Sequence, residues 1–161
     1  VAEVIHELNS QTQFDSLMLP VGSGGTLAGL IQSDEAQHNI LGIAVLKDNE
    51  QGDYLQNEVM NLLPDNARAY QRWQIMTDYH RGGYAKFNSI DCQRILAFNQ
   101  ATGICFEPVY SGKMLLALFD LIEQGYFPAH HKIILLHTGG LQGLNGLAER
   151  GLIDKSQWNN V

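Results

Sequence analysis

The sequence lacks the features of a membrane or nucleic-acid-binding protein. It has no apolar run near the ~20 residues that cross a bilayer, and its first residues do not show the basic and apolar regions of a signal peptide. Lysine and arginine form no cluster, and the formal net charge is -7. A negative field of this kind repels a phosphate backbone. We therefore expect no membrane partner, no nucleic-acid partner and a cytoplasmic location.

Residues for metal binding and nucleophilic catalysis are also scarce. Only two cysteines occur, Cys92 and Cys105, in stretches typical of buried reduced thiols, and the pattern supports no disulfide. The six histidines are scattered and form no ligand set. Neither Ser23 nor Ser111 stands in the Gly-x-Ser-x-Gly elbow of hydrolases. We expect no metal site, and a hydrolase is disfavoured.

The composition suits one globular domain. The chain has 161 residues, 45% of them hydrophobic and 17% charged. Short apolar runs alternate with stretches of helical period, which predicts an α/β fold with a mostly parallel twisted sheet and helices on both faces. The expected strands are residues 16–20, 40–46, 104–107 and 132–137. The expected helices are residues 26–31, 54–63, 90–101, 114–124 and 141–150. Segment 64–87 is less regular, although 70–76 could form another strand.

A glycine-rich segment follows the first expected strand. It runs Gly22-Ser23-Gly24-Gly25-Thr26 and opens a helix, so its backbone N–H groups can bind an anion. It lacks the Gly-Lys-Ser/Thr ending of an ATP loop, and Leu27 replaces the third glycine of the dinucleotide fingerprint. The segment therefore indicates a phosphate site. The alternative is a tight turn with Thr26 as N-cap and no ligand.

Two tyrosines and a threonine stand in or beside the other loops at strand ends. Tyr110 follows the third expected strand, Tyr84 follows two glycines, and Thr138 follows the fourth strand. A phenol can act as an acid or a base, whereas a core tyrosine with a satisfied hydroxyl is the alternative. Thr138 can cap a helix or offer its hydroxyl to a ligand. Because ligands bind beyond the carboxyl ends of parallel strands, one site can collect all three loops.

In this order, the motifs resemble those of one enzyme family. They are Val21 to Thr26, then Gly83-Tyr84 leading to Glu107 to Lys113, then Leu136 to Gly140. The series resembles the D-cysteine desulfhydrase and 1-aminocyclopropane-1-carboxylate (ACC) deaminase family of pyridoxal 5'-phosphate (PLP) enzymes, which has a tryptophan synthase β-like fold. The resemblance covers residues 14–140, and the combination is far more specific than any single motif.

The resemblance implies a PLP cofactor and a set of site residues. The cofactor phosphate would be held by Gly22, Ser23, Gly24, Gly25 and Thr26. The family's two active-site tyrosines would fall on Tyr84 and Tyr110, and the hydroxyl facing the pyridine nitrogen on Thr138. A neutral hydroxyl there weakens the electron sink of the cofactor, which favours expulsion of a β-leaving group.

Position 111 bears on the substrate. ACC deaminases usually have a glutamate after the second tyrosine, near the pyridine ring, whereas this chain has Ser111, which the resemblance implies as a further cofactor-binding residue. The resemblance therefore implies a lyase that eliminates sulfide from D-cysteine and yields pyruvate and ammonia. ACC deaminase activity, giving 2-oxobutyrate and ammonia, is the alternative within the family. A non-catalytic module that binds a phosphorylated small molecule is the alternative from another class.

A lysine that bonds to the cofactor is missing from the pattern. The family carries it in the N-terminal half, and none of the lysines here stands in that context. They are Lys47, Lys86, Lys113, Lys132 and Lys155. We therefore expect residues 1–161 to be the C-terminal part of a PLP-dependent enzyme, inactive alone. The expected partners are the N-terminal half, a small amino-acid substrate and a second copy in a homodimer.

Overall fold

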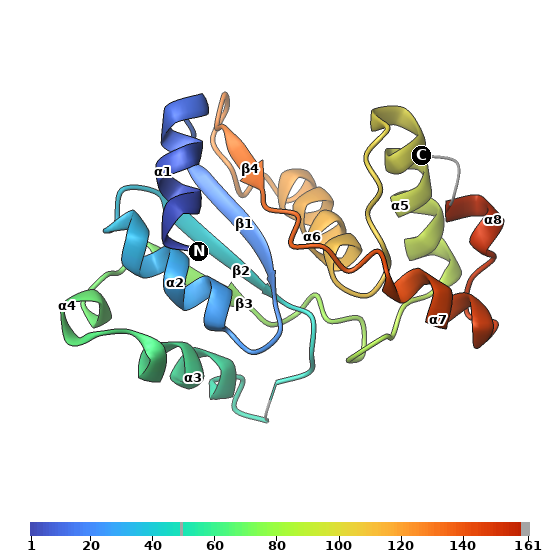
Figure 1. The fold of residues 1–161 in the computed structure, drawn as a ribbon, viewed down its shortest axis with the longest axis horizontal. Helices are drawn as coiled ribbons and strands as arrows, with labels where there is room; N and C mark the ends of the chain where they lie inside the picture. The colour runs from blue at the N-terminus through green and yellow to red at the C-terminus, as the bar shows by residue number, and fades with distance from the viewer. Residues whose placement is uncertain (49, 159–161) are drawn as a thin grey trace.

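The fold is a parallel four-stranded sheet between helices. The computed structural model describes residues 1–48 and 50–158. The strands lie in the order β3-β2-β1-β4 and comprise β1 (Ser16–Val21), β2 (Asn39–Ala44), β3 (Trp73–Met76) and β4 (Ile133–Leu135). The fold class predicted from the sequence is confirmed (Figure 1).

Eight helices occur in the described residues. They are α1 (Ala2–Gln11), α2 (Gly25–Asp34), α3 (Tyr54–Leu62), α4 (Asp65–Arg68), α5 (Ser89–Thr102), α6 (Ser111–Glu123), α7 (Gly143–Glu149) and α8 (Lys155–Trp158). The five predicted helices are present with shifted ends, whereas α1 and the short helices α4 and α8 were not among the predicted helices. No helix in the described part of the chain has the length and apolar character needed to span a membrane.

Side-chain alternation along the strands divides the core between the two faces of the sheet. Leu17 and Leu19 of β1 pack with α1, α2 and α3 on one face. Met18 of β1 and Ile43 of β2 pack with α5 and α6 on the other (Figure 1). Because both faces are covered, β1 is buried along its whole length. The carboxyl ends of the strands then remain as the place where loops can meet.

The strand predicted at residues 104–107 is wrong, because the backbone there bonds to side chains and not to a neighbouring strand. The Phe106 N–H donates to Oδ1 of buried Asn99 at 3.0 Å, and Asn99 Nδ2 donates to the Phe106 carbonyl at 2.9 Å. The Cys105 carbonyl lies 2.9 Å from His137 Nε2. With these groups satisfied, the segment stays outside the sheet. The outer strand beside β2 is β3, within the segment considered as a further strand.

The strand β4 is shorter than predicted, and a proline in β1 explains why. The β1 residues that face β4 are alternate ones: the Ser16 N–H donates to Lys132, and Met18 accepts from the Leu136 N–H. The next residue on that side is Pro20, which has no N–H to donate. The ladder therefore stops, and the chain after Leu136 is free to leave β1. The sheet opens between β1 and β4 at its carboxyl edge.

Candidate functional site

The loop after β1 leads directly into α2. Gly24 is the N-cap of this helix and has φ +88°, and a Cβ there would lie 2.7 Å from Cγ2 of Val59. Both facts require glycine at this position. Thr26 lies inside the first turn of α2, so its predicted alternative role as N-cap is wrong. The short connection between β1 and α2 therefore depends on residue 24 having no side chain.

The N-terminus of α2 is open to a ligand. No side chain caps it, and Ser23, Gly25 and Thr26 are exposed. A Cβ on Gly25 would meet no atom within 4 Å. The first backbone N–H groups of a helix have no partner within the helix, and they carry the positive end of its dipole. The geometry therefore suits an anion of phosphate size.

The N-terminus of α6, by contrast, is already occupied by Glu107. This carboxylate is 2% exposed and accepts the N–H groups of Val109 (2.7 Å), Tyr110 (2.8 Å) and Ser111 (2.7 Å). These are charge-assisted bonds at the positive end of the helix. An internal carboxylate thus fills the anion site of α6, whereas no side chain caps the N-terminus of α2.

The two candidate tyrosines lie together beside the α2 loop. A Cβ built on Gly22 would lie 3.6 Å from Cε1 and 3.8 Å from the hydroxyl oxygen of Tyr110. The ring of Tyr84 contacts Tyr110 edge to face, with centroids 6.2 Å apart. Burial raises the pKa of Tyr110, and Tyr84 and Glu107 raise it further. Its phenol is therefore protonated at neutral pH, so it has a proton to donate.

The loop after β4 approaches the same place through its glycines. His137 Nε2 is 2.9 Å from the Cys105 carbonyl, and Nδ1 accepts the Gly139 N–H at 3.1 Å. One neutral tautomer, with its proton on Nε2, satisfies both contacts. A Cβ on Gly140 would lie 3.3 Å from Oε1 of Glu107. Thr138 is exposed at the start of this turn, and it caps no helix because α7 has Gln142 as its N-cap.

Ser111 is placed differently from the other candidates. Its side chain is fully buried, and its hydroxyl lies 3.0 Å from the Glu107 N–H and 3.1 Å from Oε1 of the same residue. The hydroxyl is used to fasten the turn before α6. The structure therefore brings Gly22 to Thr26, Tyr84, Tyr110 and Thr138 to one edge of the sheet, and it turns Ser111 inward.

Two charged residues at this edge were missed from the sequence. They are Glu107 and Lys113, both buried. A glutamate just before a helix could have indicated an internal cap. A lysine in the first turn of an apolar helix runs against the helix dipole, which is also a readable anomaly. Two further lysines lie near the turn before Tyr84, since Cβ atoms built on Gly83 and Gly82 would approach the Cβ atoms of Lys47 (3.9 Å) and Lys86 (3.7 Å).

No arrangement of three metal-ligating side chains occurs among residues 1–48 and 50–158. The chemistry that the described residues offer is anion binding by backbone N–H groups and proton donation by phenols. The groups suited to these two tasks lie at the carboxyl edge of the sheet, where α/β proteins bind their ligands.

Comparisons with known proteins identify relatives in the family that the sequence motifs resemble. No family model matches the chain. D-cysteine desulfhydrase of Klebsiella pneumoniae is 30% identical over 150 residues, which are 88% of this chain and 45% of that protein. The mitochondrial bifunctional D-cysteine desulfhydrase/1-aminocyclopropane-1-carboxylate deaminase of Arabidopsis thaliana is 28% identical over 166 residues, covering 99% of this chain and 41% of that protein.

A solved structure of an ACC deaminase homologue superimposes with a TM-score of 0.73 at 31% identity. The match covers 94% of this chain and 49% of that structure. The chain thus spans somewhat less than half the length of the relatives it matches. Sequence and structure agree over nearly all of its residues, and the chain belongs to the family of D-cysteine desulfhydrases and ACC deaminases.

Proposed function

We propose that this chain is the C-terminal part of a PLP-dependent lyase that acts on a small amino acid. The observation that carries the proposal is the open N-terminus of α2 with the phenol of Tyr110 beside it. An anion held at this helix end and the proton of this phenol would lie within one ligand's width of each other. The cytoplasmic location expected from the sequence belongs to the same proposal.

The described residues fit the phosphate of PLP. The first turn of α2 supplies unpaired N–H groups, Gly25 leaves space for an anion, and no carboxylate caps this helix. Ser23 and Thr26 add exposed hydroxyls on the same turn. Bound there, the cofactor would supply an electron sink for carbanion chemistry. The lysine that bonds to it is proposed to lie in the N-terminal half.

The side chains of this chain would bind, orient and move protons. Tyr110 keeps its proton, because burial raises the pKa, and it can donate it to a leaving group. Tyr84 contacts Tyr110 and would line the site on the side of the exposed turn. Thr138 would present a neutral hydroxyl to the pyridine nitrogen, from the loop that leaves β4.

D-cysteine is the proposed substrate, with pyruvate, sulfide and ammonia as products. A protonated phenol suits the departure of a thiolate, which gains a proton as it leaves. The place taken by glutamate in ACC deaminases holds Ser111, whose hydroxyl is bound to Glu107. Deamination of ACC to 2-oxobutyrate is the second candidate, and one relative is named for both activities. The remaining candidate is a module that binds a phosphorylated ligand without turnover.

The test compares the chain alone with the chain joined to the segment encoded upstream of Val1. Mixed with PLP, the chain alone should show no visible absorbance of lysine-bound cofactor and release no pyruvate from D-cysteine. The joined protein should show both signals. Pyruvate from D-cysteine and 2-oxobutyrate from ACC are measured separately, together with sulfide, so the two activities are distinguished.

Two matched variants assign the roles in the joined protein. Tyr110→Phe should lower kcat at least tenfold while PLP binding stays within about twofold, because removing a proton donor typically costs 10²–10⁴ in rate. Tyr126→Phe, an exposed tyrosine bonded to Gln74 at the other edge of the sheet, should change neither. Turnover by the chain alone, abolished by Lys47→Met or Lys86→Met, would show that the chain carries its own cofactor lysine. Phosphate-site binding without turnover in the joined protein would favour the binding module.

A further inference from the structure

A lysine lies fully buried at the start of α6. Lys113 has no exposed surface, and its Nζ donates to the Gly83 carbonyl at 2.6 Å and to the Val45 carbonyl at 3.0 Å. Removing an ammonium from water is costly, and this one also stands at the positive end of a helix. Burial lowers the pKa of Lys113 to about 8; Arg81 also lowers it, whereas Glu107 and Asp91 raise it. Packing alone would be served better by an apolar side chain.

The lysine holds one end of the turn that carries Tyr84. Gly82 and Gly83 have φ values of +99° and +124°, conformations that other residues rarely adopt. The Gly82 N–H donates to Nδ1 of His80 at 2.9 Å. Gly83 immediately precedes Tyr84, so the bond from Lys113 acts on the residue next to the one that carries the aromatic ring.

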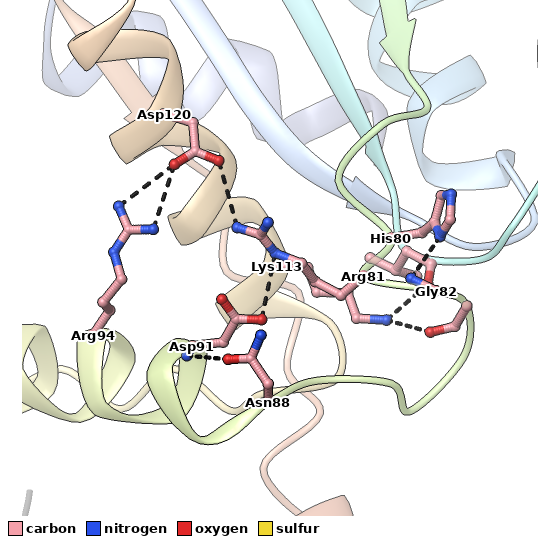
Figure 2. Close-up of polar contacts among 10 residues, drawn as sticks. His80, Arg81, Gly82, Asn88, Asp91, Arg94, Lys113 and Asp120 are labelled. Carbon is pink, nitrogen blue, oxygen red and sulfur yellow. Dashed lines mark hydrogen bonds and ion pairs between the residues drawn. The ribbon is translucent and has the colours of Figure 1, made fainter.

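The other end of the turn is held by ion pairs. Arg81 Nε lies 3.5 Å from Oδ2 of Asp91 in α5, and Arg81 Nη2 lies 3.4 Å from Oδ2 of Asp120 in α6. Arg94 approaches the second oxygen of Asp120 at 3.4 Å (Figure 2). The turn is thus tied to both helices, although Tyr84 itself is 59% exposed. Because the turn is held on both sides while the ring of Tyr84 is exposed, these contacts fix the position of the ring without burying it.

We propose that Lys113 is a positioning residue that fixes the turn of residues 80–84 and thereby holds the ring of Tyr84 against Tyr110. Its second bond fastens Val45, directly after β2, to the same ammonium. The loops after β2 and β3 are therefore joined at one atom of α6. Lys113 acts through Tyr84 and does not bond to the cofactor, because its amine is enclosed and donates to two carbonyls. The functional importance of this contact rests on the proposed function, in which Tyr84 and Tyr110 line the site.

The experiment measures hydrogen exchange of the amides of residues 82–86 in the full 161-residue chain at pH 7 and pH 9. The pKa of Lys113 is about 8 when buried, and its ordinary value is 10.5. An opening of the turn that hydrates the ammonium therefore becomes about tenfold rarer between these pH values. Protection of the turn, corrected for the intrinsic rate, should rise about tenfold in the wild-type chain. If the ion pairs of Arg81 alone held the turn, the protection of these amides would not change between pH 7 and pH 9.

Lys113→Met tests the assignment, and the exposed Lys132→Met is its matched control. Lys113→Met should exchange at least tenfold faster at residues 82–86 at pH 9, lose the pH dependence and lose the ring contact between Tyr84 and Tyr110 seen by NMR. Protection in β1 and β2 should be retained, and Lys132→Met should behave as the wild type. A folded Lys113→Met with wild-type exchange in the turn would overturn the proposal.

If Lys113→Met does not fold, the wild-type pH profile decides, and a flat profile overturns the proposal. None of these measurements needs the cofactor. Hydrogen exchange can confirm that Lys113 fixes the turn of residues 80–84 while the joined protein proves inactive. That result would reject the proposed function and leave the positioning role in place. The reverse result would reject the positioning role alone.

Discussion

The internal cap of α6 gives a sharp prediction for Glu107→Gln. This change keeps the size of the side chain and removes its charge. Oε1 accepts two backbone N–H groups and the hydroxyl of Ser111, whereas Oε2 accepts the Val109 N–H. A glutamine can keep its oxygen at the Oε1 position only by turning its NH₂ group toward the Val109 N–H. One buried donor must then remain unsatisfied.

The magnitude follows from these contacts. Losing a bond to a charged group costs about 1.5–3 kcal/mol, and an unsatisfied buried donor costs about 1–3 kcal/mol. The lost charge at the helix N-terminus adds about 0.5–1 kcal/mol. Because these contributions overlap, the free energy of unfolding should fall by about 3–5 kcal/mol, which lowers Tm by about 6–20 °C for a domain of this size.

Urea denaturation followed by circular dichroism measures this change. The matched control is Glu149→Gln, an exposed glutamate in the last turn of α7, which should change stability by less than about 0.5 kcal/mol. A loss below 1 kcal/mol for Glu107→Gln would refute the reasoning. It would mean that the helix end is satisfied by water and that Glu107 does not close it to anions.

Three further predictions concern single positions. Gly112→Ala would place a Cβ 2.5 Å from the backbone oxygen of Glu107, so thermal melts should show a loss of about 3 kcal/mol, whereas Gly143→Ala, with open space around it, should be neutral. Because its folded pKa is depressed, Lys113 binds fewer protons in the folded state between pH 8 and 10.5; stability relative to Lys113→Met should therefore rise by about 1 kcal/mol from pH 7 to 9 in urea titrations, and a fall would contradict the sign. Pro20→Val should add a ladder bond between β1 and the chain after β4, seen as a slowly exchanging amide at position 20, and rapid exchange there would contradict the account of the short strand.

Local patterns predicted the parts of this site that depend on local geometry. The glycines before α2 predict the end of a strand, a tight turn and the start of a helix in consecutive residues, and the structure has that order. The short apolar runs of β1 and β2, which alternate with stretches of helical period, likewise predicted a mostly parallel sheet. The phosphate-binding role of the loop stays a prediction, as do the roles of Tyr84, Tyr110 and Thr138.

Contacts that an apolar pattern does not record account for the errors. Residues 104–107 have an apolar character typical of a strand, but Asn99 supplies the hydrogen bonds that a neighbouring strand would give. Asn99 lies only seven positions from Phe106, but apolar patterning does not show which side chain will satisfy a backbone group. The inward direction of Ser111 depends in the same way on the burial of Glu107. The position of Lys113 beneath the turn of residues 80–84 depends on its bond to the Gly83 carbonyl, 30 positions away in the sequence.

The pairing of β1 with β4 also sets the order in which the molecule can be made. Ser16 at the start of β1 and His131 just before β4 are separated by 115 positions, and their side chains lie 2.7 Å apart. A ribosome adding about 5–20 residues per second needs roughly 6–23 s to travel that distance. During this interval β1 can pair with β2, but its other edge has no partner. Within the described residues, this edge of β1 stays without its β4 partner until residues 133–135 are synthesised, and an unpaired strand edge is a template for association with other chains.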